Sequence, residues 1–145
     1  MGTITISASV VALGVAWMAA HIIKYILQAP RDKNLDFTHR LFLSGGMPSS
    51  HAATSVAVWT VILLAEGADS AVFGLATLVT LVFCYDAVKV RRSSGEQGDA
   101  IHQIIMEQNL DIKLPRAARG HTPLEVFVGA LLGATIGAVV FFTTR

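Results

Sequence analysis

The stretch PLEVFVGALLGATIGAVVFFT, residues 123–143, is apolar almost throughout and carries one charged side chain, Glu125, near its start. A helix needs about 20 predominantly apolar residues to cross the hydrocarbon core of a bilayer. The stretch meets that length and therefore predicts a membrane-spanning helix. The whole chain fits the same environment, because it is 53% hydrophobic and only 14% charged, whereas soluble domains are about 25% charged.

Three other long runs of the sequence lack Asp, Glu, Lys and Arg entirely. Together with the first stretch they predict four transmembrane helices, at about 6–28, 50–66, 70–90 and 123–143. A soluble all-α protein with buried helices is the alternative interpretation of the same runs. The N-terminal run is long and lacks the positive segment of a signal peptide, so we interpret it as a helix of the bundle.

The length of 145 residues suits one domain, residues 1–145. We expect an all-α integral membrane bundle of about four transmembrane helices plus a short interfacial helix. The interfacial helix is predicted around Ile101 and Ile104, where apolar and polar residues alternate at helical spacing, and Gly95 is a plausible helix stop before it. A single cysteine, Cys84, excludes an internal disulfide.

The distribution of Lys and Arg predicts the orientation in the membrane. Residues 24–40 contain four of these cations and residues 86–119 contain six, whereas the turn 65–70 contains none and the C-terminus contains only Arg145. The positive-inside rule places both basic segments on the cytoplasmic face of the cell membrane and both termini outside. The net charge of +1 gives no electrostatic reason to expect a nucleic-acid partner.

The first polar motif is GGMPSSHAA, residues 45–53, at the start of the second predicted span. Ser49 or Ser50 can cap this helix, and the preceding glycines, including Gly46, allow the backbone to approach a ligand closely. Free N–H groups at a helix start favour an anion. His51 would sit in the first turn, able to exchange a proton. An ordinary capped helix with an interfacial histidine is the simpler alternative.

The second polar motif is GHTPLEV, residues 120–126, at the start of the fourth span. Thr122 and Glu125 fit a capping box with Pro123 at the first helical position, which explains these residues without any catalysis. The capping box leaves His121 unexplained. Because His121 and Glu125 are four residues apart, the carboxylate can orient the imidazole as a nucleophile or base.

The third polar motif is DAVKVRR, residues 86–92, at the end of the third span. A basic anchor at the membrane surface explains part of it. Asp86 is costly at the end of a span unless it is paired. Pairing with Lys89 or with Arg91 or Arg92 would fix a cation for phosphate binding.

The predicted topology brings these three motifs to one face of the membrane, together with Lys24 near the end of the first span. Four helix ends on one face can enclose a single pocket. Elsewhere, the stripe formed by Gly129, Gly133 and Gly137 predicts a close-packing face, used either within the bundle or in a homodimer.

The motif PSSH at residues 48–51, followed by HxxxE at 121–125, resembles the type 2 phosphatidic acid phosphatase superfamily, whose motifs run K-x6-R-P, P-S-G-H and S-R-x5-H-x3-D. The three motifs taken together are more similar to the divergent branch of that superfamily, the acid phosphatase/vanadium-dependent haloperoxidase-related membrane proteins. Lys24 and Arg31 match K-x6-R. The third-motif arginine is missing in register, and the arginines of DAVKVRR stand in for it.

The resemblance implies a membrane-embedded phosphatase that acts on an amphiphilic lipid phosphate, such as phosphatidic acid or a polyprenyl phosphate, without a metal or cofactor. In it His121 attacks phosphorus and forms a phosphohistidine, Glu125 orients His121, and His51 is the general acid. The expected phosphate-binding residues are Lys24, Gly46, Ser49, Ser50, Arg91 and Arg92, with Asp86 in support.

Two other function classes fit the same residues. The first is a membrane protein that binds or transports a phosphorylated lipid or another anion without turnover. The second is a metal-dependent membrane hydrolase that uses Asp86, Glu96, Glu125 and the histidines to hold Mg²⁺ or a similar ion. Phosphate release separates the first from the enzyme, and sensitivity to chelators separates the second.

Overall fold

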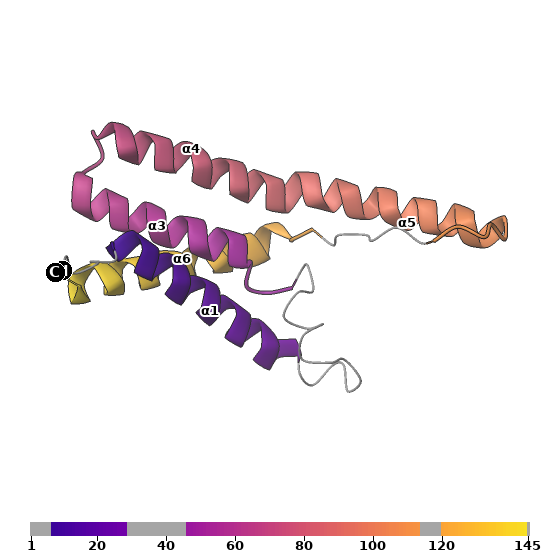
Figure 1. Ribbon diagram of the computed structural model, residues 1–145, viewed down its shortest axis with the longest axis horizontal. Coiled ribbons are helices and arrows are strands. Elements are labelled where there is room, and N and C mark those ends of the chain that lie inside the picture. Colours follow the sequence, from indigo (N-terminus) through magenta and orange to yellow (C-terminus); the bar gives the residue numbers. More distant parts are fainter. Residues whose placement is uncertain (1–6, 29–45, 114–119, 145) are drawn as a thin grey trace, which may run out of the picture.

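The computed structural model describes residues 7–28, 46–113 and 120–144, and its elements are shown in Figure 1. The described residues form helices and contain no strand. The elements are α1 (Ala8–Gln28), α3 (Ser50–Glu66), α4 (Ala71–Tyr85), η1 (Asp86–Val90), α5 (Arg91–Glu107) and α6 (Pro123–Thr143).

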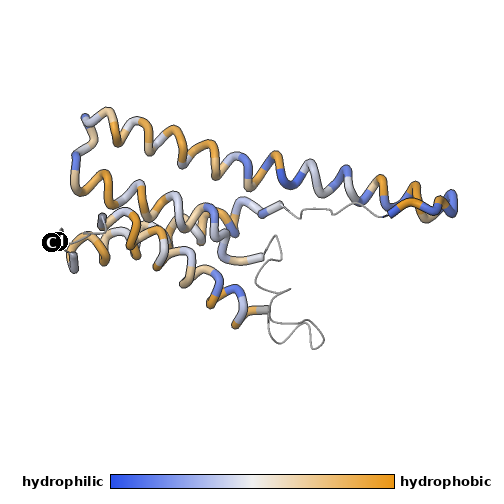
Figure 2. Tube along the Cα trace, in the orientation of Figure 1, coloured by the Kyte–Doolittle hydropathy of each residue, from blue (hydrophilic) through white to orange (hydrophobic). Residues whose placement is uncertain are grey.

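The helices confirm the predicted all-α membrane bundle. Three segments are long and apolar enough to cross a bilayer, namely Ala8–Leu27, Ala71–Glu107 and Pro123–Thr143, and α3 is a shorter apolar helix of 17 residues. The apolar residues follow α3, α4 and α6, whereas hydrophilic residues gather along α5 (Figure 2). The bounds predicted for the second and fourth spans agree with α3 and α6.

Side-chain caps explain why α3 and α6 begin where they do. Ser49 is the N-cap of α3, and its hydroxyl oxygen accepts the Ala52 N–H. At α6 the Thr122 hydroxyl accepts the Glu125 N–H while the Glu125 carboxylate accepts the Thr122 N–H, which is a complete capping box. Such caps satisfy backbone donors that the helix itself leaves without acceptors.

Helix α3 lies at the centre of the bundle and contacts α1, α4 and α6. Its closest partner is α6, because the glycine stripe of α6 faces the α3 backbone. A Cβ at Gly137 would lie 2.5 Å from the carbonyl oxygen of Ala57. A Cβ at Gly133 would meet the carbonyl oxygen of Ala53. The stripe is therefore used within the bundle, and it is not available for the predicted homodimer because α3 of the same chain covers it.

The third span continues far beyond its predicted end. Helix α4, the π-helix η1 and helix α5 form one continuous helical segment of 37 residues, Ala71–Glu107, which at 1.5 Å per residue is about 55 Å long. A bilayer core is about 30 Å thick, so α5 projects away from the bundle (Figure 1). The prediction that Gly95 stops the helix is wrong. Gly95 does not take the positive φ of a helix-ending glycine, and the predicted interfacial helix is the end of this segment.

Chain direction brings the polar motifs together at one end of the bundle. Helices α3 and α6 begin at the end where α1 and α4 finish, because the helices alternate in direction (Figure 1). Helix α1 begins and α6 ends at the opposite end. The polar starts of α3 and α6, the end of α1 and the π-helix are consequently neighbours.

Candidate active site

Two imidazoles and several charged groups form one cluster at this end of the bundle. His51 lies in the first turn of α3, and His121 lies two residues before α6. The groups that act electrostatically on His51 are Arg91, His121, Lys24 and Asp86. Lys24 and Arg91 also act on His121. The structure thus brings together residues that the sequence separates by up to about a hundred positions.

His121 is held from two directions. Its side chain is only 4% exposed, and its Nδ1 lies 3.1 Å from Oε2 of Glu125. Its backbone N–H donates to the carbonyl oxygen of Ala87 in η1 at 2.9 Å. When Nδ1–H donates to the carboxylate, the lone pair of a neutral imidazole is on Nε2. The arrangement is that of an oriented nucleophile or base.

The pKa of His121 is lowered from its ordinary value of 6.5, chiefly because burial disfavours the charged imidazolium. The positive charges of Lys24 and Arg91 act in the same direction. The hydrogen bond and charge of Glu125 oppose this change by favouring the imidazolium. The net result keeps His121 neutral, and therefore nucleophilic, to a lower pH than a free histidine.

His51 differs from His121 because its buried Nδ1 has no hydrogen-bond partner among the described residues. Buried polar side-chain atoms in proteins are nearly always paired, so such an atom calls for an explanation. The first bond within α3 runs from the Ala53 N–H to the Ser49 carbonyl, which leaves the N–H groups of Ser50 and His51 without acceptors inside the helix. These donors and the imidazole together suit an anion.

Ser49 has a structural use that limits its predicted role in phosphate binding. Its hydroxyl oxygen caps α3, and its N–H donates to the carbonyl oxygen of Glu125 at 3.0 Å. Ser49 rather than Ser50 is therefore the cap, and its backbone bond ties the start of α3 to the first turn of α6. Gly46 has φ 84°, a conformation that favours glycine, three residues before this cap.

The π-helix positions the charged pair of the third motif. The Arg91 N–H donates to the carbonyl oxygen of Asp86, five residues earlier, and Arg91 Nε lies 2.6 Å from Oδ2 of Asp86. This is one of the pairs that the sequence predicts for Asp86. Single π-turns inside α-helices are frequent at functional sites.

Arg92 points elsewhere. Its Nε pairs with Glu96 at 3.1 Å, and its side chain is 59% exposed. The two adjacent arginines, both predicted to bind phosphate, therefore differ in environment, and Arg91 is the one that acts on both imidazoles.

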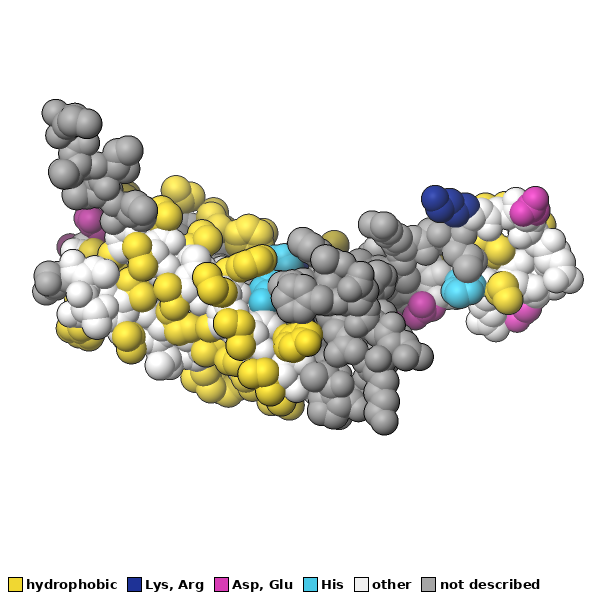
Figure 3. All heavy atoms as spheres, turned by 60° about the horizontal axis from the view of Figure 1, so that its bottom comes forward, with side chains coloured by type: hydrophobic (Ala, Val, Ile, Leu, Met, Phe, Trp, Pro, Cys, Tyr) yellow, Lys and Arg dark blue, Asp and Glu magenta, His cyan; other side chains and the backbone are white. Residues whose placement is uncertain are grey.

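A polar cavity of about 300 Å³ lies beside His121. Arg92, Glu96 and Asp99 of α5 line one side of it, and His121 and Thr122 line the other. In Figure 3 apolar side chains cover the bundle, whereas charged side chains gather on the projecting part of α5. The cavity therefore places His121 beside the charged side chains of α5.

Some features that build the site were not predicted from the sequence. Gly120 passes so close to Arg92 that a Cβ there would meet the Arg92 backbone, which fixes the approach of His121 to the π-helix. The π-turn and the hydrogen bond from the His121 N–H to the Ala87 carbonyl oxygen are backbone features. No distinctive side chain in the sequence indicates them. Of the predicted residues, Arg31 lies outside the described residues.

The acidic groups proposed for a metal site lie in separate pairs. Asp86 pairs with Arg91, Glu96 with Arg92, and Glu125 with His121. Within the described parts of the chain, no three His, Cys, Asp or Glu side chains form a set that could hold a metal ion. The metal-dependent alternative therefore has no ligand set among those residues.

Comparison with known proteins identifies the family of the chain. Residues 6–136 match the Divergent PAP2 family. The chain is 32% identical to the uncharacterized membrane protein YuiD of Bacillus subtilis (strain 168), in an alignment that covers 85% of this chain and 87% of that protein. No solved structure matches. The family match extends over most of the chain and includes every motif of the site, so the chain belongs to the Divergent PAP2 family of membrane proteins.

Proposed function

We propose that this protein is a membrane-embedded phosphatase that hydrolyses a lipid phosphate monoester through a phosphohistidine on His121. The observation that carries the proposal is the pairing of His121 Nδ1 with Glu125 beside a second imidazole and two cations. That arrangement supplies a nucleophile, a proton donor and positive charge around one point. Phosphoryl transfer depends mainly on such positioning and electrostatic stabilisation.

In the first step, Lys24, Arg91 and the free N–H groups at the start of α3 bind the phosphate oxygens. The lone pair on His121 Nε2 attacks phosphorus, and the bond from phosphorus to the lipid oxygen breaks. His51 gives its proton to that oxygen, which leaves as the lipid alcohol. The negative phosphate favours the protonated form of His51 before this transfer, because an opposite charge stabilises the imidazolium.

In the second step, water attacks the phosphohistidine. His51, now neutral, takes a proton from the water, and the phosphorus–nitrogen bond to His121 breaks. Inorganic phosphate is released and both imidazoles return to their starting states. Glu125 holds Nδ1–H of His121 throughout, so that Nε2 is the atom that gains and loses the phosphoryl group.

The substrate is an amphiphile because the site lies at the end of helices that suit a bilayer. Its phosphate would be at the membrane surface and its hydrocarbon part among the helices. Purified protein in detergent micelles should release inorganic phosphate from such lipids, for example from phosphatidic acid or a polyprenyl phosphate.

The His121→Ala variant should lose this release by at least about 10³-fold, the loss expected when a nucleophile is removed. His102→Ala is the matched control, because His102 is exposed on α5 outside the cluster. It should keep the wild-type rate. Acid-labile, base-stable incorporation of labelled phosphate should appear in wild type and be absent from His121→Ala.

Equal rates for wild type and His121→Ala would reject the nucleophile. Phosphate-dependent lipid binding without any release would favour the binding or transport protein. Activity that a chelator abolishes, and that added Mg²⁺ restores, would favour the metal-dependent hydrolase.

We also propose that the site faces the cytoplasm, from the excess of Lys and Arg in the segments on that side. The test uses the Cys84→Ala background, since Cys84 is the one cysteine of the chain. In intact cells an impermeant maleimide should label Ala68→Cys, in the turn before α4. It should label Ser94→Cys, on α5, only after permeabilisation, and the reverse pattern would overturn the orientation.

A further inference from the structure

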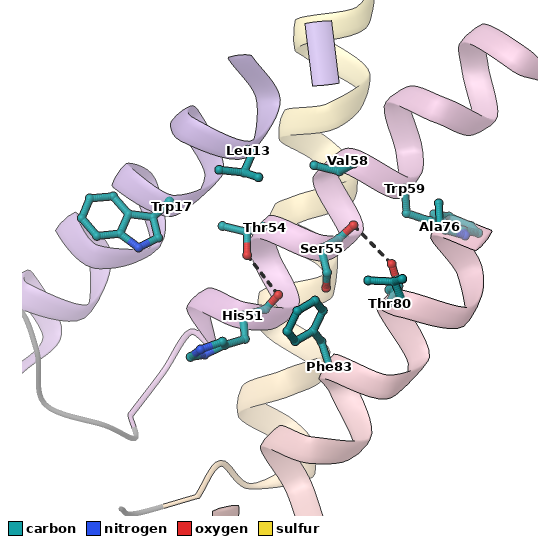
Figure 4. A pocket seen from close by; sticks show the side chains of 11 residues that line it. Leu13, Trp17, His51, Thr54, Ser55, Val58, Trp59, Ala76, Thr80 and Phe83 are labelled. Carbon is teal, nitrogen blue, oxygen red and sulfur yellow. Dashed lines mark hydrogen bonds between the residues drawn. The ribbon is translucent and has the colours of Figure 1, made fainter. Parts of the chain in front are cut away.

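An apolar groove of about 310 Å³ lies between α1, α3 and α4 (Figure 4). Its walls include Leu13 and Trp17 of α1, Val58 and Trp59 of α3, and Ala76 and Phe83 of α4. This volume is at the lower end of the range for small-molecule sites. The groove therefore suits a narrow apolar group rather than a large headgroup.

The hydroxyl groups in the groove wall are already bonded within the protein. Thr54 donates to the carbonyl oxygen of Ser50 at 2.9 Å and lies 3.1 Å from that of His51. Thr80 donates across to the carbonyl oxygen of Ser55 at 3.3 Å. A ligand in the groove would meet carbon atoms along most of its length.

His51 is the exception, because it lines the groove and also belongs to the charged cluster. Figure 4 shows His51 at one end of the groove, where Phe83 also lies. The groove is thus continuous with the proposed phosphate site through this one imidazole. A ligand that occupies both the groove and the phosphate site would have an apolar group attached directly to its charged end.

We propose that the groove binds the hydrocarbon chain attached to the leaving oxygen of the substrate, and that the substrate is a phosphate monoester of a single long-chain alcohol. This inference rests on the proposed function. In an in-line displacement the nucleophile and the leaving oxygen are on opposite sides of phosphorus. His51 would protonate the oxygen on the groove side, while His121 would attack from the opposite side, where it also borders the second cavity.

The chain provides its own reporter for this site, because it contains two tryptophans and both line the groove. Trp17 packs on His21 with ring centroids 4.2 Å apart. Trp59 donates from Nε1 to the Thr77 hydroxyl at 2.8 Å. Both rings are therefore held in position, and their fluorescence should respond to a quencher placed between them.

The binding test measures tryptophan quenching by a dibrominated octadecyl phosphate in detergent micelles. A dibrominated octadecanol at the same mole fraction measures quenching from simple partition into the micelle. The phosphate compound should quench at least two-fold more strongly, and unlabelled hexadecyl phosphate should reverse the difference. Equal quenching by the two compounds would overturn the groove proposal.

The activity test fills the groove. Ala76→Phe places a ring in it, whereas Ala71→Phe adds the same ring at an exposed position on the same helix. Ala76→Phe should lower kcat/KM for hexadecyl phosphate at least ten-fold and leave hydrolysis of a short water-soluble phenyl phosphate within two-fold. Ala71→Phe should leave both within two-fold. If Ala76→Phe does not fold, Val79→Phe, also in the groove wall, replaces it.

The two proposals can fail separately. Phosphate-dependent quenching in a wild-type protein that releases no phosphate from any lipid phosphate would support the groove and reject the enzyme. Phosphatase activity that is equal on phosphatidic acid and hexadecyl phosphate, and that Ala76→Phe does not change, would support the enzyme and overturn the groove.

Discussion

Helix α3 has two neighbours that it contacts in different ways. Against α6 it packs through the glycine stripe, with the α6 backbone so close that an added methyl group would touch α3 carbonyl oxygens. Against α4 it is joined by side-chain hydrogen bonds, from Trp59 to Thr77 and from Thr80 to Ser55. No residue of α4 is buried. Small-residue packing and polar bonds between helices are two general ways to associate helices in lipid.

The two interfaces of α3 suit different purposes: one fixes the positions of the histidines, and the other leaves room for the groove. The α3–α6 interface joins His51 and His121 through backbone contacts, including the Ser49 N–H to the Glu125 carbonyl. Catalytic groups need such fixed positions, because small displacements cost large factors in rate. The α3–α4 interface leaves room for the apolar groove. A helix held loosely by its own bundle can make space for a lipid chain.

The largest expected effect comes from breaking the tight interface. Gly133→Ala adds a Cβ that meets the Ala53 backbone, and neither backbone can move away without separating the helices. We expect a loss of about 3 kcal/mol in stability, the upper end of the cost of overpacking. The thermal unfolding midpoint in detergent should fall by many degrees, and Gly133→Leu should prevent folding.

The matched control is Gly74→Ala on α4, where an added Cβ would meet nothing within 4 Å. Its unfolding midpoint should be unchanged or higher, since alanine favours a helix over glycine. Similar losses for Gly133→Ala and Gly74→Ala would contradict the close approach of the α6 glycines to the α3 backbone.

The second prediction concerns the start of α5, directly after η1, which contacts α6 at the cluster. Arg91→Ala should lower kcat/KM for lipid phosphate by about 10²- to 10³-fold, the usual loss for one group that stabilises transition-state charge. Arg92→Ala should lower it only a few-fold, because Arg92 is exposed and paired with Glu96. Phosphate release at low substrate concentration measures both, and comparable losses would contradict the assignment of Arg91 alone to the cluster.

Much of this arrangement follows from sequence, and particular residues explain why. The bounds of α3 and α6 were predicted because Ser49 and Thr122 are strong caps next to long apolar runs. The position of the three polar motifs at one end of the bundle was predicted by counting the membrane spans. A cation partner for Asp86, either Lys89 or one of the two arginines, was predicted because an unpaired carboxylate at a membrane boundary is costly.

Other features could not be predicted because they depend on tertiary contacts. Gly95 has the composition of a helix end, yet it remains helical between α4 and the projecting part of α5. The π-turn at Asp86–Val90 changes backbone hydrogen bonds without changing the apolar pattern. The groove requires α4 to stand away from α1, and an apolar run contains no signal for that distance.

The third prediction uses the pKa of His121. Because burial lowers this pKa below the ordinary 6.5, the neutral nucleophile persists into mildly acid solution. The acid limb of kcat/KM should lie below about pH 6.5. Glu125→Gln removes an influence that raises the pKa, so it should move the limb to still lower pH while also reducing kcat.

Comparing both proteins on the same substrate cancels the titration of the substrate phosphate. A limb that moves to higher pH in Glu125→Gln would contradict the contact between Glu125 and His121.

The lowered pKa of His121 should also make folding stability depend on pH. The unfolded chain binds a proton at His121 near pH 6.5 and the folded protein only at lower pH, so folding stability should fall as the pH drops below about 6.5.

The smallest expected effect comes from the loose interface. Thr77→Val keeps the shape of the side chain but removes the acceptor of the Trp59 Nε1–H. Hydrogen bonds between membrane helices contribute about 0.6 kcal/mol on average, so the unfolding midpoint should fall only slightly. Thr135→Val is the control, because Thr135 is exposed and bonds only to the Leu131 carbonyl of its own helix. Since Trp59 lines the groove, Thr77→Val should also change its fluorescence, and an unchanged spectrum would show that this bond does not position the ring.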